Sequence, residues 1–85
     1  MNLPSQIWYI YIIECSDKTL YTGITNNLER RIHQHNTGKG ARYTKGRAPV
    51  TLLKSFNVDN KSEALKLEYK IKQLSREEKL NFTIS

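Results

Sequence analysis

The strongest hydrophobic pattern lies near the amino terminus, where residues 7–13 are nearly all apolar and rich in β-branched and aromatic side chains. Such a run predicts a central strand that is buried on both faces. Residues 16–18 supply turn chemistry and residues 19–22 return as a second strand before Gly23, which together predict an antiparallel hairpin. Because successive strand side chains alternate, two sets separate: Tyr9, Tyr11 and Ile13 on one face, and Trp8, Ile10 and Ile12 on the other.

Polar residues at capping spacing predict where the helices begin. Asn26 with Glu29 predicts a helix over residues 27–36 that ends near Gly38. We expect a loop or short helix over residues 38–46 and a strand over residues 50–56. Two more capping pairs, Asn60 with Glu63 and Ser75 with Glu78, predict helices over roughly 61–74 and 76–83. We therefore expect a single α/β (α+β) domain over residues 1–85, in which helices flank a small three-stranded antiparallel sheet.

One carboxylate interrupts the apolar stripe of the helix expected over residues 61–74. At about 100° per residue, Glu68 falls near the middle of a broad face that consists of Ala64, Leu65, Leu67, Ile71 and Leu74. An unpaired ionised carboxylate is costly to bury, so it must be paired, protonated or bound to a cation. A salt bridge to an arginine, or a side chain tipped to the edge of the helix, is one explanation; metal binding or acid–base chemistry is the other.

A second polar cluster is expected where the first helix meets the hairpin. Arg31 and His35 are one helical turn apart at the rim of the predicted core, whereas Arg30 and His33 point away from it. Taken alone, His35 is also explained as a partly buried, hydrogen-bonded histidine, and Arg31 as a surface charge. Tyr11 and Tyr21 lie on paired strands and are equally explained as core tyrosines with a wet hydroxyl, but Gly23 permits close approach of backbone or ligand beside them.

The formal net charge of +6 is unevenly distributed, because no acidic residue lies between Glu29 and Asp59. A basic block suits a polyanion whose phosphates displace counterions, although a solvated basic surface is the plainer alternative. Within this block, the loop over 38–46 and its flank would present cations to a nucleic-acid backbone and an aromatic ring to a base: Lys39, Arg42, Lys45 and Arg47, with Tyr43. An ordinary flexible loop is the alternative reading of this segment.

Several classes of protein are disfavoured by the composition. A single cysteine, Cys15, cannot form an internal disulfide, and no Cys/His cluster has zinc-site spacing, which favours a reducing, cytoplasmic setting. The apolar run over residues 7–13 is far shorter than the roughly 20 residues of a membrane span. Residues 1–6 lack the basic start of a signal peptide, so we expect a soluble, unprocessed chain with no membrane partner.

These segments, taken in order, resemble the GIY-YIG nuclease superfamily over essentially the whole chain. The first two signatures are Tyr9-Ile10-Tyr11 and Tyr21-Thr22-Gly23, with Tyr9 where the family has glycine and Thr22 where it has isoleucine. Residues 28–35 and 64–68 resemble the family's arginine-bearing and metal-binding helices, and residues 20–25 and 38–44 are similar to its small standalone bacterial members. Asn81 is near the place of a late family asparagine, and we keep it outside the core site.

The resemblance implies hydrolysis of a DNA phosphodiester with one divalent metal, Mg²⁺ or Mn²⁺. Glu68 would hold the metal, Arg31 would stabilise the developing negative charge, and Tyr11 would orient or deprotonate the attacking water. Tyr21 would share the hydrogen-bond network of that water, and His35 would act as a proton acceptor or phosphate contact. Because a free tyrosine has a pKa of about 10, a base role for Tyr11 requires Arg31 or the metal to lower it.

Two function classes remain open from the sequence. The first is a metal-dependent DNA endonuclease with little intrinsic sequence specificity, for which a protein partner would supply specificity because no DNA-reading module accompanies the domain. The second is a catalytically weak nucleic-acid-binding module that retains the nuclease fold. An intact set of Tyr11, Tyr21, Arg31, His35 and Glu68 favours cutting, since a binding module has no use for a carboxylate in a phosphate-attracting cleft without a cation.

Overall fold

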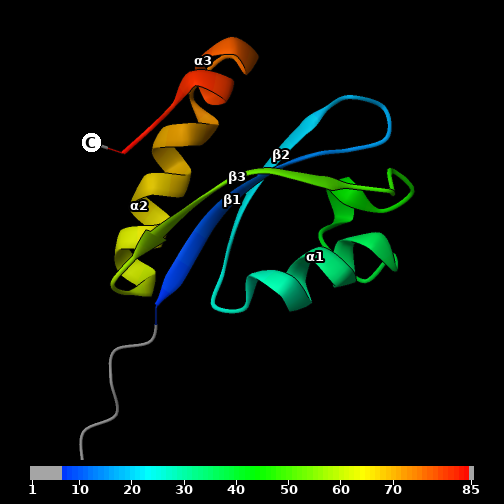
Figure 1. Cartoon of the computed structure of the whole chain (residues 1–85), viewed down its shortest axis with the longest axis horizontal. Coiled ribbons are helices and arrows are strands. Elements are labelled where there is room, and N and C mark those ends of the chain that lie inside the picture. The colour runs from blue at the N-terminus through cyan, green and yellow to red at the C-terminus, as the bar shows by residue number, and fades with distance from the viewer. Residues whose placement is uncertain (1–6, 85) are drawn as a thin grey trace, which may run out of the picture.

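The computed structural model describes residues 7–84 and forms a mixed α/β fold in which a three-stranded antiparallel sheet is flanked by helices (Figure 1). This confirms the predicted fold class. In chain order, the elements are β1 (Trp8–Glu14), β2 (Leu20–Thr25), α1 (Leu28–Asn36), a 3-10 turn (Arg42–Thr44), β3 (Thr51–Val58), α2 (Lys61–Lys72) and α3 (Arg76–Asn81). Residues 1–6, where we expected no signal peptide, lie outside the described part of the chain.

The sheet has the order β2-β1-β3, so the most apolar segment is the central strand, as predicted. The side chains of residues 10–13 of β1 are fully buried. Pairing with β1 extends both outer strands beyond the predicted bounds, because Tyr9 pairs with Thr25 on β2 and Trp8 with Val58 on β3. The predicted strands at 19–22 and 50–56 are therefore 20–25 and 51–58 in the structure.

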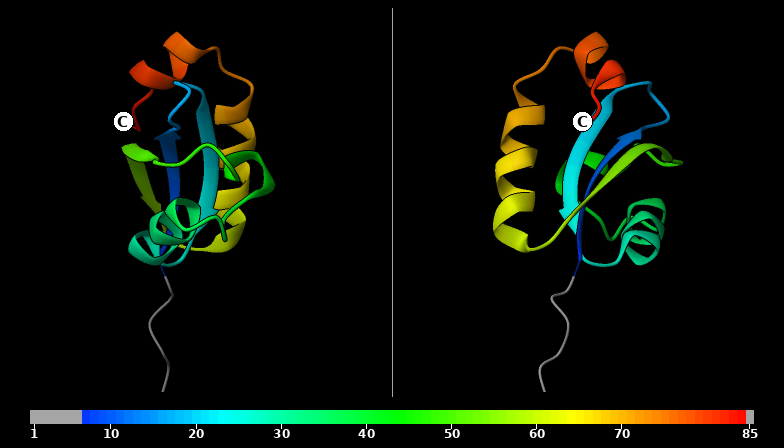
Figure 2. Two further views of the ribbon diagram at one scale, coloured as in Figure 1. Left: turned by 90° about the vertical axis from the view of Figure 1, so that its right-hand side faces the viewer. Right: turned by 60° about the vertical axis from the view of Figure 1, so that its left-hand side comes forward.

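The helices cover opposite faces of the sheet, α2 on one and α1 on the other (Figure 2). Ile10 and Ile12 pack with Ala64 and Ile71 of α2 in one buried cluster. The other cluster has Tyr11, Ile13, Cys15 and Val50 at its centre, with Tyr21, Leu28 and Ile32 against it. The alternation of β1 side chains therefore gives the molecule two separate cores, as the strand pattern predicted.

The helix starts are set by side-chain caps. The N-cap of α1 is Asn27, whose side chain accepts a hydrogen bond from the backbone N–H of Arg30, so the predicted start at Asn26 was wrong by one residue. Thr25 explains the shift, since its hydroxyl accepts from the Asn27 N–H at 3.1 Å and leads the chain out of β2. Asn60 caps α2, and Ser75 and Glu78 form a complete capping box on α3. Both of these helices end two residues earlier than expected, at 72 and 81.

The buried stripe of α2 is narrower than the sequence predicted. Ala64 and Ile71 are fully buried and Leu67 is half-buried, but Leu65 is 47% exposed. The prediction for Leu65 was wrong because a three-stranded sheet offers only a narrow face. A residue about 100° away from Ala64 therefore faces solvent.

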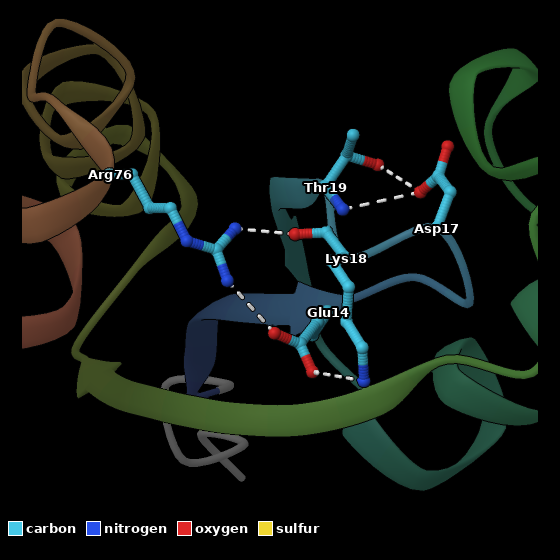
Figure 3. A network of polar contacts seen from close by, with 5 residues as sticks. All are labelled: Glu14, Asp17, Lys18, Thr19 and Arg76. Atoms are coloured by element: carbon cyan, nitrogen blue, oxygen red, sulfur yellow. Dashed lines mark hydrogen bonds and ion pairs between the residues drawn. The ribbon is translucent and has the colours of Figure 1, made fainter.

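The tip of the β1–β2 hairpin is connected to α3 by Arg76 (Figure 3). Its guanidinium donates to the backbone carbonyl of Lys18 and, at 2.9 Å, to the carboxylate of Glu14. Within the turn, the backbone N–H and hydroxyl of Thr19 donate to Asp17 at 3.2 and 2.6 Å. Each of these exposed contacts contributes little to the free energy of folding by itself. Together they hold the turn that joins the strands of Tyr11 and Tyr21.

Within residues 7–84, no helix combines the length and apolar character needed to cross a membrane. Cys15 is buried and is not in a disulfide.

Candidate active site

Tyr11 lies at the centre of the candidate site, fully buried on the α1 face of the sheet. Its Cα partner across the hairpin is Gly23, and the phenol ring lies directly over that glycine. A Cβ atom at position 23 would overlap the Tyr11 hydroxyl. The close approach that the sequence predicted for Gly23 is therefore made by Tyr11, and glycine is required to leave room for its phenol.

The Tyr11 hydroxyl meets two side chains from α1. It lies 2.8 Å from Nε2 of His35 and accepts a hydrogen bond from Nε of Arg31 at 3.4 Å. The one-turn spacing of Arg31 and His35 thus brings both side chains to one phenol, as predicted. Arg31 also donates to the Gln34 side chain at 3.1 Å, while Arg30 points into solvent.

His35 is not at the rim of the core, where we expected it, but fully buried. The segment after α1 folds over it, so closely that a Cβ atom at Gly40 would overlap the imidazole. The rings of Tyr11 and Tyr21 pack edge-on against it, with centroids 5.6 and 5.5 Å away. Both ring nitrogens of His35 have polar partners inside the fold, Tyr11 and Thr44, so of its two predicted roles this geometry favours that of proton acceptor.

Burial sets the protonation states of these groups. Loss of solvation, with the nearby Arg31 charge, lowers the pKa of His35 from 6.5 to about 4, so its imidazole is neutral at pH 7. Burial also raises the pKa of Tyr11 above 10.0. The hydrogen bond from Arg31 lowers that pKa, as a base role for Tyr11 requires, but the effect of desolvation is larger. Tyr11 is therefore a protonated phenol in the resting site.

Glu68 lies on α2 with its side chain 18% exposed, and it forms an ion pair with Lys72 at 3.3 Å. The expected partner was an arginine; the structure has a lysine one turn further along the same helix. Such an i,i+4 pair contributes only about 0.3–0.5 kcal/mol of stability, and the lysine side chain is 49% exposed. Among residues 7–84, no hydrogen bond or ion pair joins Glu68 to Tyr11, and its charge is the smallest of the causes that act on the Tyr11 pKa.

Tyr21, on β2, connects this cluster to the loop beyond α1. Its ring lies 6.3 Å from that of Tyr11 and stacks on Tyr43 at 5.7 Å. The guanidinium of Arg47 lies 4.4 Å above the Tyr43 ring and pairs with Asp17. Both side chains predicted to meet nucleic acid, Tyr43 and Arg47, therefore make contacts within the fold, and their role in binding stays a prediction.

The other cations predicted to meet a nucleic-acid backbone, Lys39, Arg42 and Lys45, are exposed on the segment that covers His35. Asn81, which we kept outside the site, is exposed at the end of α3.

Sequence reasoning missed Thr44. This residue closes the 3-10 turn, is 1% exposed, and places its hydroxyl oxygen 2.7 Å from Nδ1 of His35. Its place in the segment 38–44, already singled out for its resemblance to small bacterial nucleases, was the one available signal.

Glu68 is the one predicted metal ligand. Among residues 7–84, there is no group of three or more His, Cys, Asp or Glu side chains arranged to hold a metal. A single hard carboxylate suits Mg²⁺ or Mn²⁺, since Mg²⁺ usually keeps several waters and binds through one or two carboxylates together with substrate phosphates. A site of this kind does not suit zinc, which takes several nitrogen or sulfur ligands.

A family model described as the GIY-YIG catalytic domain matches residues 7–81, and the chain therefore belongs to the GIY-YIG family. Within that family it is similar to UPF0213 proteins. It is 56% identical to one from Halobacterium salinarum over 84% of this chain and 92% of the relative, and 58% identical to one from Oceanobacillus iheyensis over 85% and 84%.

Two solution NMR structures resemble the fold. A UPF0213 protein from Bacillus halodurans has a TM-score of 0.55 at 45% identity and covers 88% of this chain and 80% of its own. A protein from E. faecalis has a TM-score of 0.63 at 36% identity, with 92% and 83% covered. Membership of the family supports a nuclease-type function with nucleic acid as the substrate.

Proposed function

We propose that this protein is a divalent-metal-dependent DNA endonuclease that hydrolyses phosphodiester bonds with little sequence specificity. The observation that carries the proposal is the Tyr11 hydroxyl, which lies between a guanidinium (Arg31) and a neutral imidazole (His35). A positive donor and a proton acceptor at one phenol, together with Glu68 as the proposed metal ligand, are the groups that water attack on a phosphodiester requires.

In this mechanism, Tyr11 holds the attacking water and accepts its proton. A phenol whose pKa is raised is a poor base by itself, so its own proton must leave as the water's proton arrives. Nε2 of the neutral His35, 2.8 Å away, is placed to take that proton. Arg31, which already donates to the phenol oxygen, stabilises the negative charge that develops on the phenol and on the phosphate.

Glu68 would hold the metal. A Mg²⁺ or Mn²⁺ ion bound there would polarise a phosphate oxygen of the substrate. Tyr21, packed against both Tyr11 and His35, would keep the phenol in place and contribute its own hydroxyl to the hydrogen bonds of the water.

DNA would be held through its backbone by exposed cations beside the covered imidazole, Lys39, Arg42 and Lys45. Backbone contacts carry no sequence information, so specificity would come from the structure of the DNA or from a protein partner. We further propose that residues 1–85 act as one domain and that the protein acts in the cytoplasm, where its DNA substrate is found.

The test is nicking of supercoiled plasmid DNA with Mg²⁺, with Mn²⁺ and with chelator, combined with measurement of DNA binding at several salt concentrations. We expect Glu68→Ala and Arg31→Ala to abolish metal-dependent nicking while salt-sensitive binding persists. Matched controls are Glu63→Ala, an exposed carboxylate on the same helix that also pairs with a lysine, and Arg30→Ala, the exposed neighbour of Arg31. Full nicking by the Glu68 and Arg31 variants would refute the assignment.

The second candidate is a catalytically weak nucleic-acid-binding module. It is favoured by one observation, the Glu68–Lys72 ion pair, which competes with a metal for the carboxylate. In this case the wild-type protein would bind DNA in a salt-sensitive way but nick none with either metal. Lys72→Ala would then leave DNA uncut, whereas the nuclease proposal expects this variant to bind the metal at least as well as the wild type.

A further inference from the structure

Thr44 is a polar residue in a fully buried position, and its hydroxyl meets the candidate site at His35. Its hydroxyl oxygen lies 2.7 Å from Nδ1 of His35 and 2.9 Å from the backbone carbonyl oxygen of Ala41. The same carbonyl accepts from the backbone N–H of Thr44 at 3.1 Å, which closes the 3-10 turn. Thr44 is therefore held rigidly by its own turn and presents one oxygen atom to the imidazole.

Counting protons along this chain of contacts assigns each donor. A carbonyl oxygen only accepts, so the single hydroxyl proton of Thr44 is directed to Ala41. In this arrangement the Thr44 oxygen accepts from His35, which places the proton of the neutral imidazole on Nδ1. Nε2 is left without a proton and can only accept, and the partner 2.8 Å away is the hydroxyl of Tyr11.

The result is one continuous direction of donation across the site. Arg31 donates to Tyr11, Tyr11 donates to His35, His35 donates to Thr44, and Thr44 donates to Ala41. In the opposite tautomer, Nε2–H would donate to Tyr11, and Nδ1 would need the proton that Thr44 gives to Ala41. The Tyr11 proton would then have no acceptor in the imidazole, and the Ala41 carbonyl would lose its side-chain donor.

We propose that Thr44 is a positioning residue that fixes His35 in the Nδ1-protonated tautomer, so that its bare Nε2 accepts the proton of Tyr11. The catalytic consequence rests on the proposed nuclease function, whereas the tautomer itself does not. Gly40 supports the same contact. Any side chain at this position would push the covering segment away from the imidazole and move the Thr44 hydroxyl away from Nδ1 of His35.

The direct test is ¹⁵N-resolved NMR of the histidine ring nitrogens in the full chain at pH 7. His35 should show a protonated Nδ1 and an unprotonated Nε2, with the exposed His33 as an internal reference. Thr44→Val keeps the shape and removes the hydroxyl, and we expect it to convert His35 to the Nε2-protonated tautomer. Thr44→Ser keeps the hydroxyl and should retain the wild-type spectrum. A wild-type His35 protonated on Nε2 would overturn the proposal whether or not Thr44→Val folds.

The kinetic readout is the nicking of supercoiled DNA with Mg²⁺ by the same variants. We expect Thr44→Val to lower kcat roughly 10-fold to 100-fold with little change in KM, and Thr44→Ser to restore most of it. A Thr44→Val protein that keeps both the Nδ1 proton and full kcat would overturn the proposal. A wild-type protein with the expected tautomer that nicks no DNA would overturn the proposed function and support the assignment of Thr44.

Discussion

The two faces of β1 are equally buried, but one is covered by apolar side chains and the other by hydrogen-bonded polar side chains. Toward α2, Ile10 and Ile12 pack against Ala64 and Ile71, and these side chains carry no polar atom. Toward α1, Tyr11 reaches His35, and the contact continues to the hydroxyl of Thr44. The first face needs only apolar area and good packing, whereas the second needs every polar group to have a partner.

The difference shows how so small a chain can provide both stability and chemistry. Residue parity along β1 decides which face each of its side chains joins, so the apolar side chains are separate from Tyr11 and its partners, and Glu68 is the one proposed site residue carried by the helix on the apolar face. The polar cluster is correspondingly vulnerable, because each of its members loses a partner when its neighbour is changed. Substitutions on the two faces should therefore separate stability from activity.

The largest expected effect is the loss of activity in Tyr11→Phe. The ring is kept, but the hydroxyl between Arg31 and His35 is removed, so nicking should fall by about 100-fold to 10,000-fold. Stability should fall only by about 1–3 kcal/mol, the cost of leaving Nε2 of His35 without a partner. Tyr9→Phe, on the same strand and half-buried, is the matched control and should nick normally. Equal activities of the two variants would contradict the central role of Tyr11.

The opposite result is expected for Ile12→Ala on the α2 face. Removing a fully buried isoleucine should lower the free energy of unfolding by about 2–5 kcal/mol, as measured by urea denaturation. Nicking per folded molecule should fall far less than in Tyr11→Phe, because Ile12 points away from Tyr11 and meets the site only through the helix that carries Glu68. If the alanine variant does not fold, Ile12→Val should show a loss of about 0.5–1.5 kcal/mol with normal nicking. A drop in nicking by folded Ile12→Val would show that the two faces are coupled.

The polar face should also make stability depend on pH. His35 has a pKa of about 4 in the folded protein and 6.5 as its reference value, so the unfolded chain binds more protons between these values. The contribution of His35 to the free energy of unfolding is therefore fully present above about pH 6.5. It is lost as the pH falls toward 4, which lowers the free energy of unfolding by on the order of 3 kcal/mol.

Urea denaturation from pH 7 to pH 4.5 measures this dependence. Most of that range lies above the reference pKa values of Asp17 and Glu78, 3.8 and 4.5, which hydrogen bonds from Thr19 and Ser75 lower in the folded protein, so these groups contribute mainly at its acid end. His35→Asn should flatten the curve, while His33→Asn, a change at an exposed position, should keep the wild-type slope. An unchanged slope in the His35 variant would show that the imidazole is not responsible.

Sequence patterns were most reliable where a regular period extends over a whole element. Alternation along residues 7–13 predicted the central strand and its two faces, and the one-turn spacing of Arg31 and His35 predicted that both would meet Tyr11. The segment over 38–46 has no such period, and its conformation is set by contacts distant in the sequence. For this reason the burial of His35, the contact with Thr44, and the engagement of Tyr43 and Arg47 were not predicted.

The smallest expected effects come from replacing one buried threonine with valine on each face of the sheet, at positions 22 and 44. Thr22 pairs with Ile12 and faces α2, and its buried hydroxyl is without a hydrogen-bond partner in the part of the chain that the structure describes. Thr22→Val should therefore raise the free energy of unfolding by up to about 1–2 kcal/mol and leave nicking unchanged. Thr44→Val removes a hydroxyl with two partners and should lower both stability and nicking. Urea denaturation and nicking assays of the two variants measure these changes. Equal changes in both variants would show that the hydrogen-bond partners of a buried hydroxyl do not determine how its removal affects stability and nicking.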